Sequence, residues 1–233
     1  MSSIIAMGGG GFSMEPDNPA LDRYVVAQTG KARPKVCFVP TASGDAELYV
    51  LHFYQAFTEL ECIPSSLSLF RPPTGDLEDF VMEKDAIYVG GGNTRNMLAL
   101  WKEWGLDSIL KRAHAAGVVL AGISAGANCW FESFTTDSMP GQISVLPGLG
   151  ILPGSFTPHY DGEAERRPAL HRLLLEGRIQ PGLASDNSSA VHYQDGALAR
   201  CISSRREAPV YRVTLAKGEV VEEKLPLTFV GPA

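Results

Sequence analysis

The chain has 233 residues, of which 45% are hydrophobic and 20% charged, and its formal net charge is -6 at pH 7. This composition excludes a disordered or fibrous chain, and the absence of a basic cluster argues against nucleic acid or an anionic membrane as partner. The four cysteines form no CxxC pair and no apolar stretch reaches membrane-spanning length. We therefore expect no metal site, cytoplasmic residence and a small substrate.

Short β-branched segments alternate with amphipathic stretches along the first half of the chain, and the opening segment is typical of a first strand rather than a signal peptide. The expected strands lie at 4–7, 36–40, 65–70, 86–89 and 118–121, and the expected helices at 20–29, 47–58, 94–104 and 107–115. This βαβ alternation predicts a three-layer α/β/α fold whose mainly parallel sheet carries helices on both faces.

The second half of the chain has a different character. A stretch rich in Gly and Pro at 139–158 predicts an irregular loop, and a polar helix is expected at 164–175. Short strand candidates separated by turn residues fill 183–230, which predicts an antiparallel edge. Because no repeat or linker interrupts the chain, we expect residues 1–233 to form one domain.

The strand at 118–121 runs directly into Gly122-Ile-Ser-Ala-Gly126, which matches G-x-S-x-G in the strand-then-helix context of a nucleophile elbow. Small neighbours leave room for the strained backbone that such a Ser requires, and the following helix start offers free amide groups. We therefore predict that Ser124 is the nucleophile of an acyl-transfer reaction and that Ala125 N–H is one oxyanion donor. A Gly/Ser turn that merely begins a helix is the alternative.

A second glycine loop, Gly90-Gly-Gly-Asn-Thr94, follows the strand at 86–89 and would lie at the same edge of the sheet, where open α/β sheets bind ligands. Gly91 or Gly92 could supply the other oxyanion contact. A simple tight turn is the alternative, and neither this loop nor Gly8-Gly-Gly-Gly11 has the pattern of a phosphate-binding loop.

A Ser nucleophile needs a general base, and five histidines are available: His52, His114, His159, His171 and His192. His159 is preferred, because it follows Pro158 at a predicted strand end or loop, whereas the others fall in helical patterns or a late strand. For the carboxylate that orients the base, the spacing leaves Asp137, Asp161 and Asp186 open.

Three motifs in this order, Gly90-Gly-Gly-Asn-Thr94, Gly122-Ile-Ser-Ala-Gly-Ala-Asn128 and Pro158-His-Tyr160, resemble peptidase E, the aspartyl dipeptidase branch of the cyanophycinase-like serine peptidases. The resemblance extends from the first strand to about residue 200. It implies a fold related to class I glutamine amidotransferases, with Ser124 as nucleophile, His159 as base, Asp186 preferred as third member, and Asp137 as the alternative.

The same resemblance implies a substrate, namely a dipeptide with N-terminal aspartate. Asn93 and Arg166 are expected to contact it, and the adjacent Arg167 is the alternative to Arg166. Glu163 and Glu165 could equally pair with both arginines on a solvated helix. No cofactor is expected, and relatives include monomers and homodimers. The competing functions are a broader exopeptidase or cyanophycinase-like hydrolase, an esterase, and a noncatalytic ligand-binding member of the fold.

Overall fold

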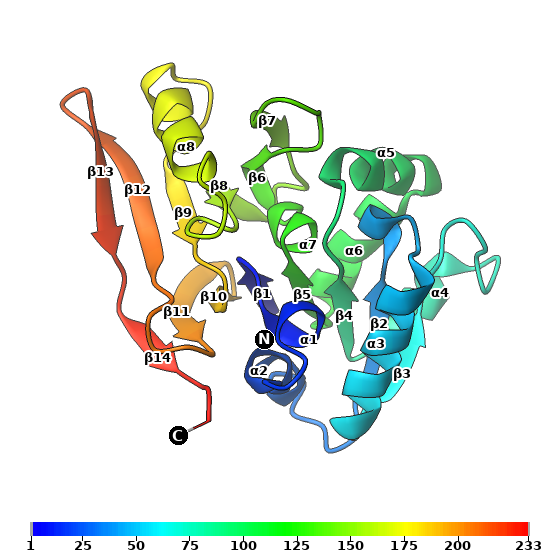
Figure 1. Ribbon diagram of the computed structural model, residues 1–233. Helices are drawn as coiled ribbons and strands as arrows, with labels where there is room; N and C mark the ends of the chain where they lie inside the picture. Colours follow the sequence, from blue (N-terminus) through cyan, green and yellow to red (C-terminus); the bar gives the residue numbers. More distant parts are fainter. Residues whose placement is uncertain (1, 233) are drawn as a thin grey trace.

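The computed structural model describes residues 2–232 and contains two sheets (Figure 1). The larger sheet has the strand order β14-β11-β10-β1-β5-β4-β2-β3. Its strands are β1 (Ser3–Met7), β2 (Lys35–Val39), β3 (Ile63–Ser66), β4 (Ala86–Val89), β5 (Val119–Ile123), β10 (Ser189–Gln194), β11 (Ala197–Ser203) and β14 (Leu227–Phe229). Strands β1 to β5 are parallel to one another, while β10 joins β1 and β11 in antiparallel register.

Helices cover both faces of the larger sheet. They are α1 (Gly11–Met14), α2 (Ala20–Ala27), the 3-10 turn η1 (Thr41–Ser43), α3 (Glu47–Glu59), α4 (Leu77–Met82), α5 (Thr94–Trp104), α6 (Leu106–Ala115) and, at the end of β5, α7 (Ala125–Asn128). Alternate residues of a strand point to opposite faces. Accordingly Ile5 and Met7 pack with α1, α2 and α3, whereas Ile4 and Ala6 pack with α4, α5 and α6.

The smaller sheet has the order β13-β12-β9-β8-β6-β7. Its strands are β6 (Phe131–Thr136), β7 (Ser144–Pro147), β8 (Leu152–Thr157), β9 (Gly182–Ser185), β12 (Val210–Ala216) and β13 (Glu219–Lys224), and helix α8 (Arg166–Leu175) packs on it. Pairs β6–β8 and β8–β9 are parallel, and the remaining pairs are antiparallel.

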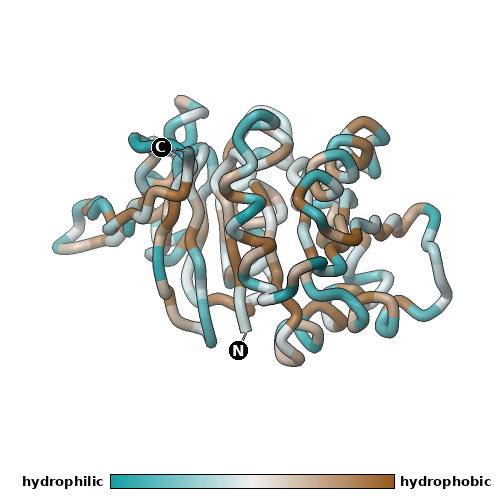
Figure 2. The backbone as a smooth tube through the Cα atoms, turned by 90° about the horizontal axis from the view of Figure 1, so that it is seen from below, coloured by the Kyte–Doolittle hydropathy of each residue, from teal (hydrophilic) through white to brown (hydrophobic). Residues whose placement is uncertain are grey.

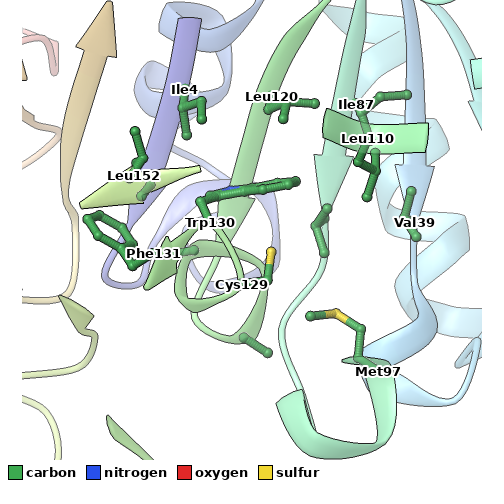
Figure 3. Packing of buried hydrophobic residues seen from close by; sticks show 14 of the residues in the cluster. Ile4, Val39, Ile87, Met97, Leu110, Leu120, Cys129, Trp130, Phe131 and Leu152 are labelled. Atoms are coloured by element: carbon green, nitrogen blue, oxygen red, sulfur yellow. The ribbon is translucent and has the colours of Figure 1, made fainter. Parts of the chain in front are cut away.

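The apolar core runs from one sheet to the other. Ile4 and Leu120 of the larger sheet belong to the same buried cluster as Phe131 and Leu152 of the smaller one, and Trp130 lies between them (Figure 3). In the hydropathy-coloured view, apolar stretches concentrate in the strands inside the molecule and polar ones on outer turns (Figure 2). Within residues 2–232, no helix combines the length and the apolar character needed to cross a bilayer.

The α/β class and the mainly parallel sheet are confirmed. Two expectations were wrong in detail: the strand placed at 65–70 is β3 at Ile63–Ser66, and the supposed loop at 139–158 contains all of β7 and β8. Helix α4 was not predicted. Gly154 in β8 has φ 76°, and the register between β6 and β8 shifts near Phe131 and Ser133. Such bulges break the alternation by which a strand is recognised.

Candidate active site

Ser124 lies between β5 and α7 with φ 55° and ψ -110°, a conformation that a non-glycine residue adopts only where its surroundings enforce it. A Cβ atom on Gly122 would lie 2.2 Å from the Gly126 carbonyl oxygen, and one on Gly126 would lie 2.2 Å from that of Val89. The turn therefore tolerates no side chain at these two positions. The Ser124 N–H donates to the Met7 carbonyl at 3.1 Å, which fixes the elbow to β1.

Three backbone N–H groups were predicted as oxyanion donors, and in the structure they differ in whether they already donate a hydrogen bond. Gly91 lies against the nucleophile, but its N–H donates to the Tyr49 hydroxyl at 3.2 Å. The N–H groups of Gly92 and Ala125 donate to no other group of residues 2–232. Ala125 is the first residue of α7, where an N–H has no partner within the helix. Gly92 and Ala125 are thus the donors that remain free to receive an oxyanion.

His159 stands at the loop after β8 with φ 51°, and its N–H donates to the Gly8 carbonyl at 3.1 Å. Its Nδ1 atom lies 2.7 Å from Asn187 Oδ1. An amide oxygen can only accept, so Nδ1 carries the proton and Nε2 keeps the lone pair that a general base needs. A Cβ atom on Gly9 would lie 2.0 Å from Asn187 Oδ1, so a glycine is required beside this pair.

The expectation that Asp186 orients His159 requires correction, because the residue in contact with His159 is its neighbour Asn187. Strand β9 ends at Ser185 and the chain turns at Asn187 and Ser188, so the two neighbouring side chains point to different surroundings. Asp186 instead faces the charges of Asp161 and Arg167. Burial, reinforced by Asp161, raises the pKa of Asp186 to about 7. Asp161 also accepts the Asn187 N–H at 2.8 Å, which fixes the orienting residue.

Ser124 and His159 line one hollow of about 510 Å³ together with two glycines of the loop, Gly91 and Gly92. Met14 of α1 and Leu48, Tyr49 and His52 of α3 form another part of the wall of this hollow. No hydrogen bond joins the Ser124 hydroxyl to His159 among residues 2–232. Catalytic hydrogen bonds are often long before substrate binds and tighten in the complex. The hollow thus brings Ser124, His159 and Gly92 to one place, and Ala125 directly follows Ser124 in the chain.

Arg166, at the start of α8, is buried with only 2% of its surface exposed. Its guanidinium pairs with Glu163 at 2.6 Å and with Asp137 at 3.2 Å, and its Nη1 atom has no partner. Asp137 is therefore the counter-ion of Arg166 and does not contact His159 here. A guanidinium with an unused buried N–H donor can still bind the carboxylate of a ligand.

Asn93 does not present its side chain to the hollow. Its Oδ1 atom accepts the N–H of Asn96 at 3.0 Å and so caps α5, while its Nδ2 donates to the Ser138 carbonyl at 3.1 Å. Both ends of the amide are used within the protein. Instead of contacting substrate, Asn93 in this structure ties the glycine loop to the segment that carries Asp137.

Two residues of the site escaped sequence reasoning. Asn187 is not among the candidates named from the sequence, although an Asn beside an Asp at a strand end is also a possible partner for a His. Tyr49 lies on a helix far from both motifs in the chain and reaches the glycine loop only through folding. Within residues 2–232, no cluster of three or more His, Cys, Asp or Glu could hold a metal ion.

The chain is similar to known peptidases along most of its length. The model of Peptidase family S51 matches residues 4–201, which include Ser124 and His159. The uncharacterized peptidase YgaJ of Bacillus subtilis is 56% identical over 99% of this chain and 100% of its own length. Peptidase E of Streptomyces coelicolor is 30% identical over 81% of this chain and 79% of its own.

A solved structure shows the same fold at greater distance. The crystal structure of a peptidase from an acI-B1 actinobacterium superposes with a TM-score of 0.71 at 18% identity, covering 97% of this chain and 95% of that one. This similarity concerns the fold alone. The family match over most of the chain carries the assignment: the chain belongs to Peptidase family S51 and is a serine peptidase.

Proposed function

We propose that this peptidase is a dipeptidase that prefers an N-terminal aspartate and works through an acyl-enzyme. His159 Nε2 takes the Ser124 proton, and the alkoxide attacks the scissile carbonyl. The N–H groups of Gly92 and Ala125 stabilise the oxyanion, and His159 then protonates the leaving amine. Water, activated by the same base, releases the acyl group.

One observation carries the chemistry: Ser124 is held at a positive φ above the start of α7, in the same hollow as a His whose Nδ1 is already paired. A strained Ser beside free N–H groups has no structural purpose that a relaxed residue could not serve better. In this proposal Asn187 orients His159, and Asp137 is the counter-ion of Arg166.

Recognition of aspartate is assigned to Arg166. Its guanidinium is buried and keeps one unpaired donor, whereas the side chain of its partner Asp137 is 64% exposed. An exposed carboxylate is readily exchanged for one delivered by a substrate, because its loss from the pair is compensated by water. A bidentate guanidinium contact would then select a carboxylate side chain.

The test follows amine release from Asp-Leu, Glu-Leu, Ala-Leu, Leu-Asp and Ser-Leu by wild type, Ser124→Ala, Arg166→Ala and, as control, Arg178→Ala. Arg178 is an exposed Arg just beyond α8. We expect Ser124→Ala to abolish hydrolysis. Arg166→Ala should lower kcat/KM for Asp-Leu by about 10²-fold or more, while leaving Ala-Leu within a few-fold.

Equal losses on Asp-Leu and Ala-Leu in Arg166→Ala would contradict specific recognition of aspartate and leave the broader exopeptidase. Ser124-dependent hydrolysis of the matched esters without cleavage of any of the peptides would favour the esterase, because esters are more reactive than amides and a peptidase also hydrolyses them. Full activity in Ser124→Ala would overturn the mechanism itself.

A further inference from the structure

A patch of exposed apolar side chains borders the hollow that contains Ser124 and His159. Met14 of α1 is 48% exposed and Leu48 of α3 is 69% exposed, and both line the hollow. Large apolar side chains left in water at a concave surface mark sites of binding, whereas the same residues scattered singly do not. The proposed mechanism gives no role to the wall that Met14 and Leu48 form.

The wall is held in place before any ligand arrives. The N–H of Gly10 donates to the Met14 sulfur at 3.2 Å. The adjacent Glu15 accepts hydrogen bonds from Ser188 at 2.9 Å and Ser204 at 2.6 Å, which anchors the end of α1. Helix α3 is anchored by the fully buried Phe53 and Phe57. A preformed surface of this kind binds without a large cost of ordering.

The position of His159 decides which part of a substrate meets this wall. In acyl transfer the base returns its proton to the leaving amine, so the leaving residue lies on the side of the base. His159 faces the same hollow as Met14 and Leu48. The carboxylates that pair with Arg166 line a separate hollow, and α8 and α3 lie on either side of α7 (Figure 1).

We propose that Met14 and Leu48 form a subsite for a large apolar side chain on the residue that follows the scissile bond. This inference rests on the proposed peptidase mechanism, since a leaving residue exists only if a peptide is cleaved. Among the described residues that line the hollow, none is Lys, Arg, Asp or Glu. A charged leaving side chain would lose water there without gaining a counter-ion, so Leu or Phe is preferred over Lys or Ser.

The test compares kcat/KM for Asp-Leu, Asp-Ser and Asp-Lys. If another N-terminal residue is cleaved faster than Asp, dipeptides with that residue before Leu, Ser and Lys are used instead. Wild type is compared with Leu48→Glu and Leu51→Glu. Leu51 is 49% exposed on the same helix but does not line the hollow, which makes it a matched control. Both substituted side chains are exposed, so both variants should fold.

In wild type we expect a preference for Leu over Ser of about tenfold or more, from the apolar contact of the side chain. Leu48→Glu should remove this preference and favour Lys, and Leu51→Glu should keep the wild-type order. Labelling of Ser124 by a fluorophosphonate probe is measured in each variant. If Ser124 is labelled but no dipeptide is cleaved, protection from the probe by leucinamide relative to serinamide replaces the rate ratio.

Each outcome has a defined meaning. Intact labelling with equal rates, or equal protection, for Leu and Ser would overturn the subsite and leave the proposed peptidase mechanism standing. The same loss of preference in Leu51→Glu as in Leu48→Glu would also overturn it. Absence of both labelling and hydrolysis in folded protein would overturn the mechanism, and the subsite with it.

Discussion

Asn187 gives the base of this site a neutral partner. A carboxylate in that position would both fix the imidazole tautomer and stabilise the imidazolium formed during reaction, whereas an amide oxygen fixes the tautomer only. The hydrogen bond of 2.7 Å from His159 Nδ1 is nevertheless short, and it is possible because Gly9 has no Cβ atom to clash with Asn187. Orientation rather than charge is what this contact supplies.

Asn187→Ala should therefore lower kcat by roughly 10²-fold with little change in KM, because the imidazole loses its fixed tautomer. Asp186→Asn should keep kcat within a few-fold, since Asp186 faces away from the base. Steady-state kinetics on the best dipeptide, with circular dichroism to verify folding, checks both variants. A larger loss in Asp186→Asn than in Asn187→Ala would restore Asp186 as the orienting residue.

Tyr49 holds the glycine loop in place by a hydrogen bond and by packing of its ring. Its hydroxyl accepts the Gly91 N–H, and its ring packs against Gly90, where an added Cβ atom would lie 3.0 Å from the ring. Tyr49→Phe removes only the acceptor, so the loop should loosen and the Gly92 N–H should be less well aimed. We expect kcat to fall about tenfold with KM unchanged. A rise in kcat would instead show that Gly91 is the donor and that Tyr49 obstructs it.

The residues that sequence reasoning found are those whose geometry is local. Ser124 and its small neighbours specify the elbow within one short segment, and Pro158 helps to place His159 at a loop. The orienting residue could not be found in this way, because Asp186 and Asn187 are adjacent and only the direction of the chain at the strand end decides between them. Tyr49 depends on how α3 packs on the sheet, which no local pattern specifies.

At the scale of elements, β13 and α8 are joined by a network of charged and polar groups that includes the residue after His159. Glu222 accepts hydrogen bonds from Arg167, His171 and the Tyr160 hydroxyl. Burial acts to raise the pKa of Glu222, but these hydrogen bonds, that of Arg167 first, lower it to about 2. Because Tyr160 follows His159 in the chain, the hairpin of β12 and β13 supports the loop that carries the base.

Glu222→Gln should lower the free energy of unfolding by about 1.5–3 kcal/mol, since three donors lose a charged acceptor. The lowered pKa means that this stabilisation is complete above the ordinary pKa of 4.5 and is lost as pH falls towards 2. Urea unfolding at pH 7 and pH 3 checks the expectation: the difference between wild type and variant should shrink at the lower pH. A constant difference would contradict a charge-based role.

The helices and parallel strands were predictable because their periodicity is regular, and β4 and α5 begin and end at the predicted residues. The smaller sheet was predicted only in part: strands were expected within 183–230, but β6, β7 and β8 were not expected. Its parallel strands β6 and β8 are distorted by a register shift, and β8 contains Pro153 and Gly154, which in a sequence indicate a loop. Pairing across the sheet maintains strands that the local sequence alone would not favour.

At the scale of the whole molecule, buried carboxyls set the response to pH. Burial raises the pKa of Asp22 to about 7, against the opposing hydrogen bond from the Tyr88 hydroxyl. The folded state therefore binds more protons than the unfolded state between about pH 4 and 7. The resulting stabilisation is complete below the unfolded pKa of 3.8 and is lost as pH rises through 7.

Asp22→Asn, which imitates the protonated acid, should flatten the fall of stability with pH by at most about 1.4 kcal/mol per pH unit. Thermal unfolding from pH 5 to 8 measures this, and an unchanged slope would contradict a raised pKa.

We also infer that the two sheets form one domain, because a single apolar cluster joins them. The same scans should then show one transition, and two separate transitions would argue for two units.

Three successive carbonyls at the end of β1 each hold a different part of the catalytic apparatus. Met7 accepts the N–H of Ser124, Gly8 that of His159, and Gly9 that of Ser188, next to Asn187. The residues proposed as nucleophile, base and orienting residue are thus mounted on one short piece of main chain, while Met14, Leu48 and the carboxylates that pair with Arg166 lie on helices and loops outside it. Mutation can therefore remodel substrate choice on either side without disturbing the reaction, and such a scaffold is well suited to evolutionary divergence of specificity at constant chemistry.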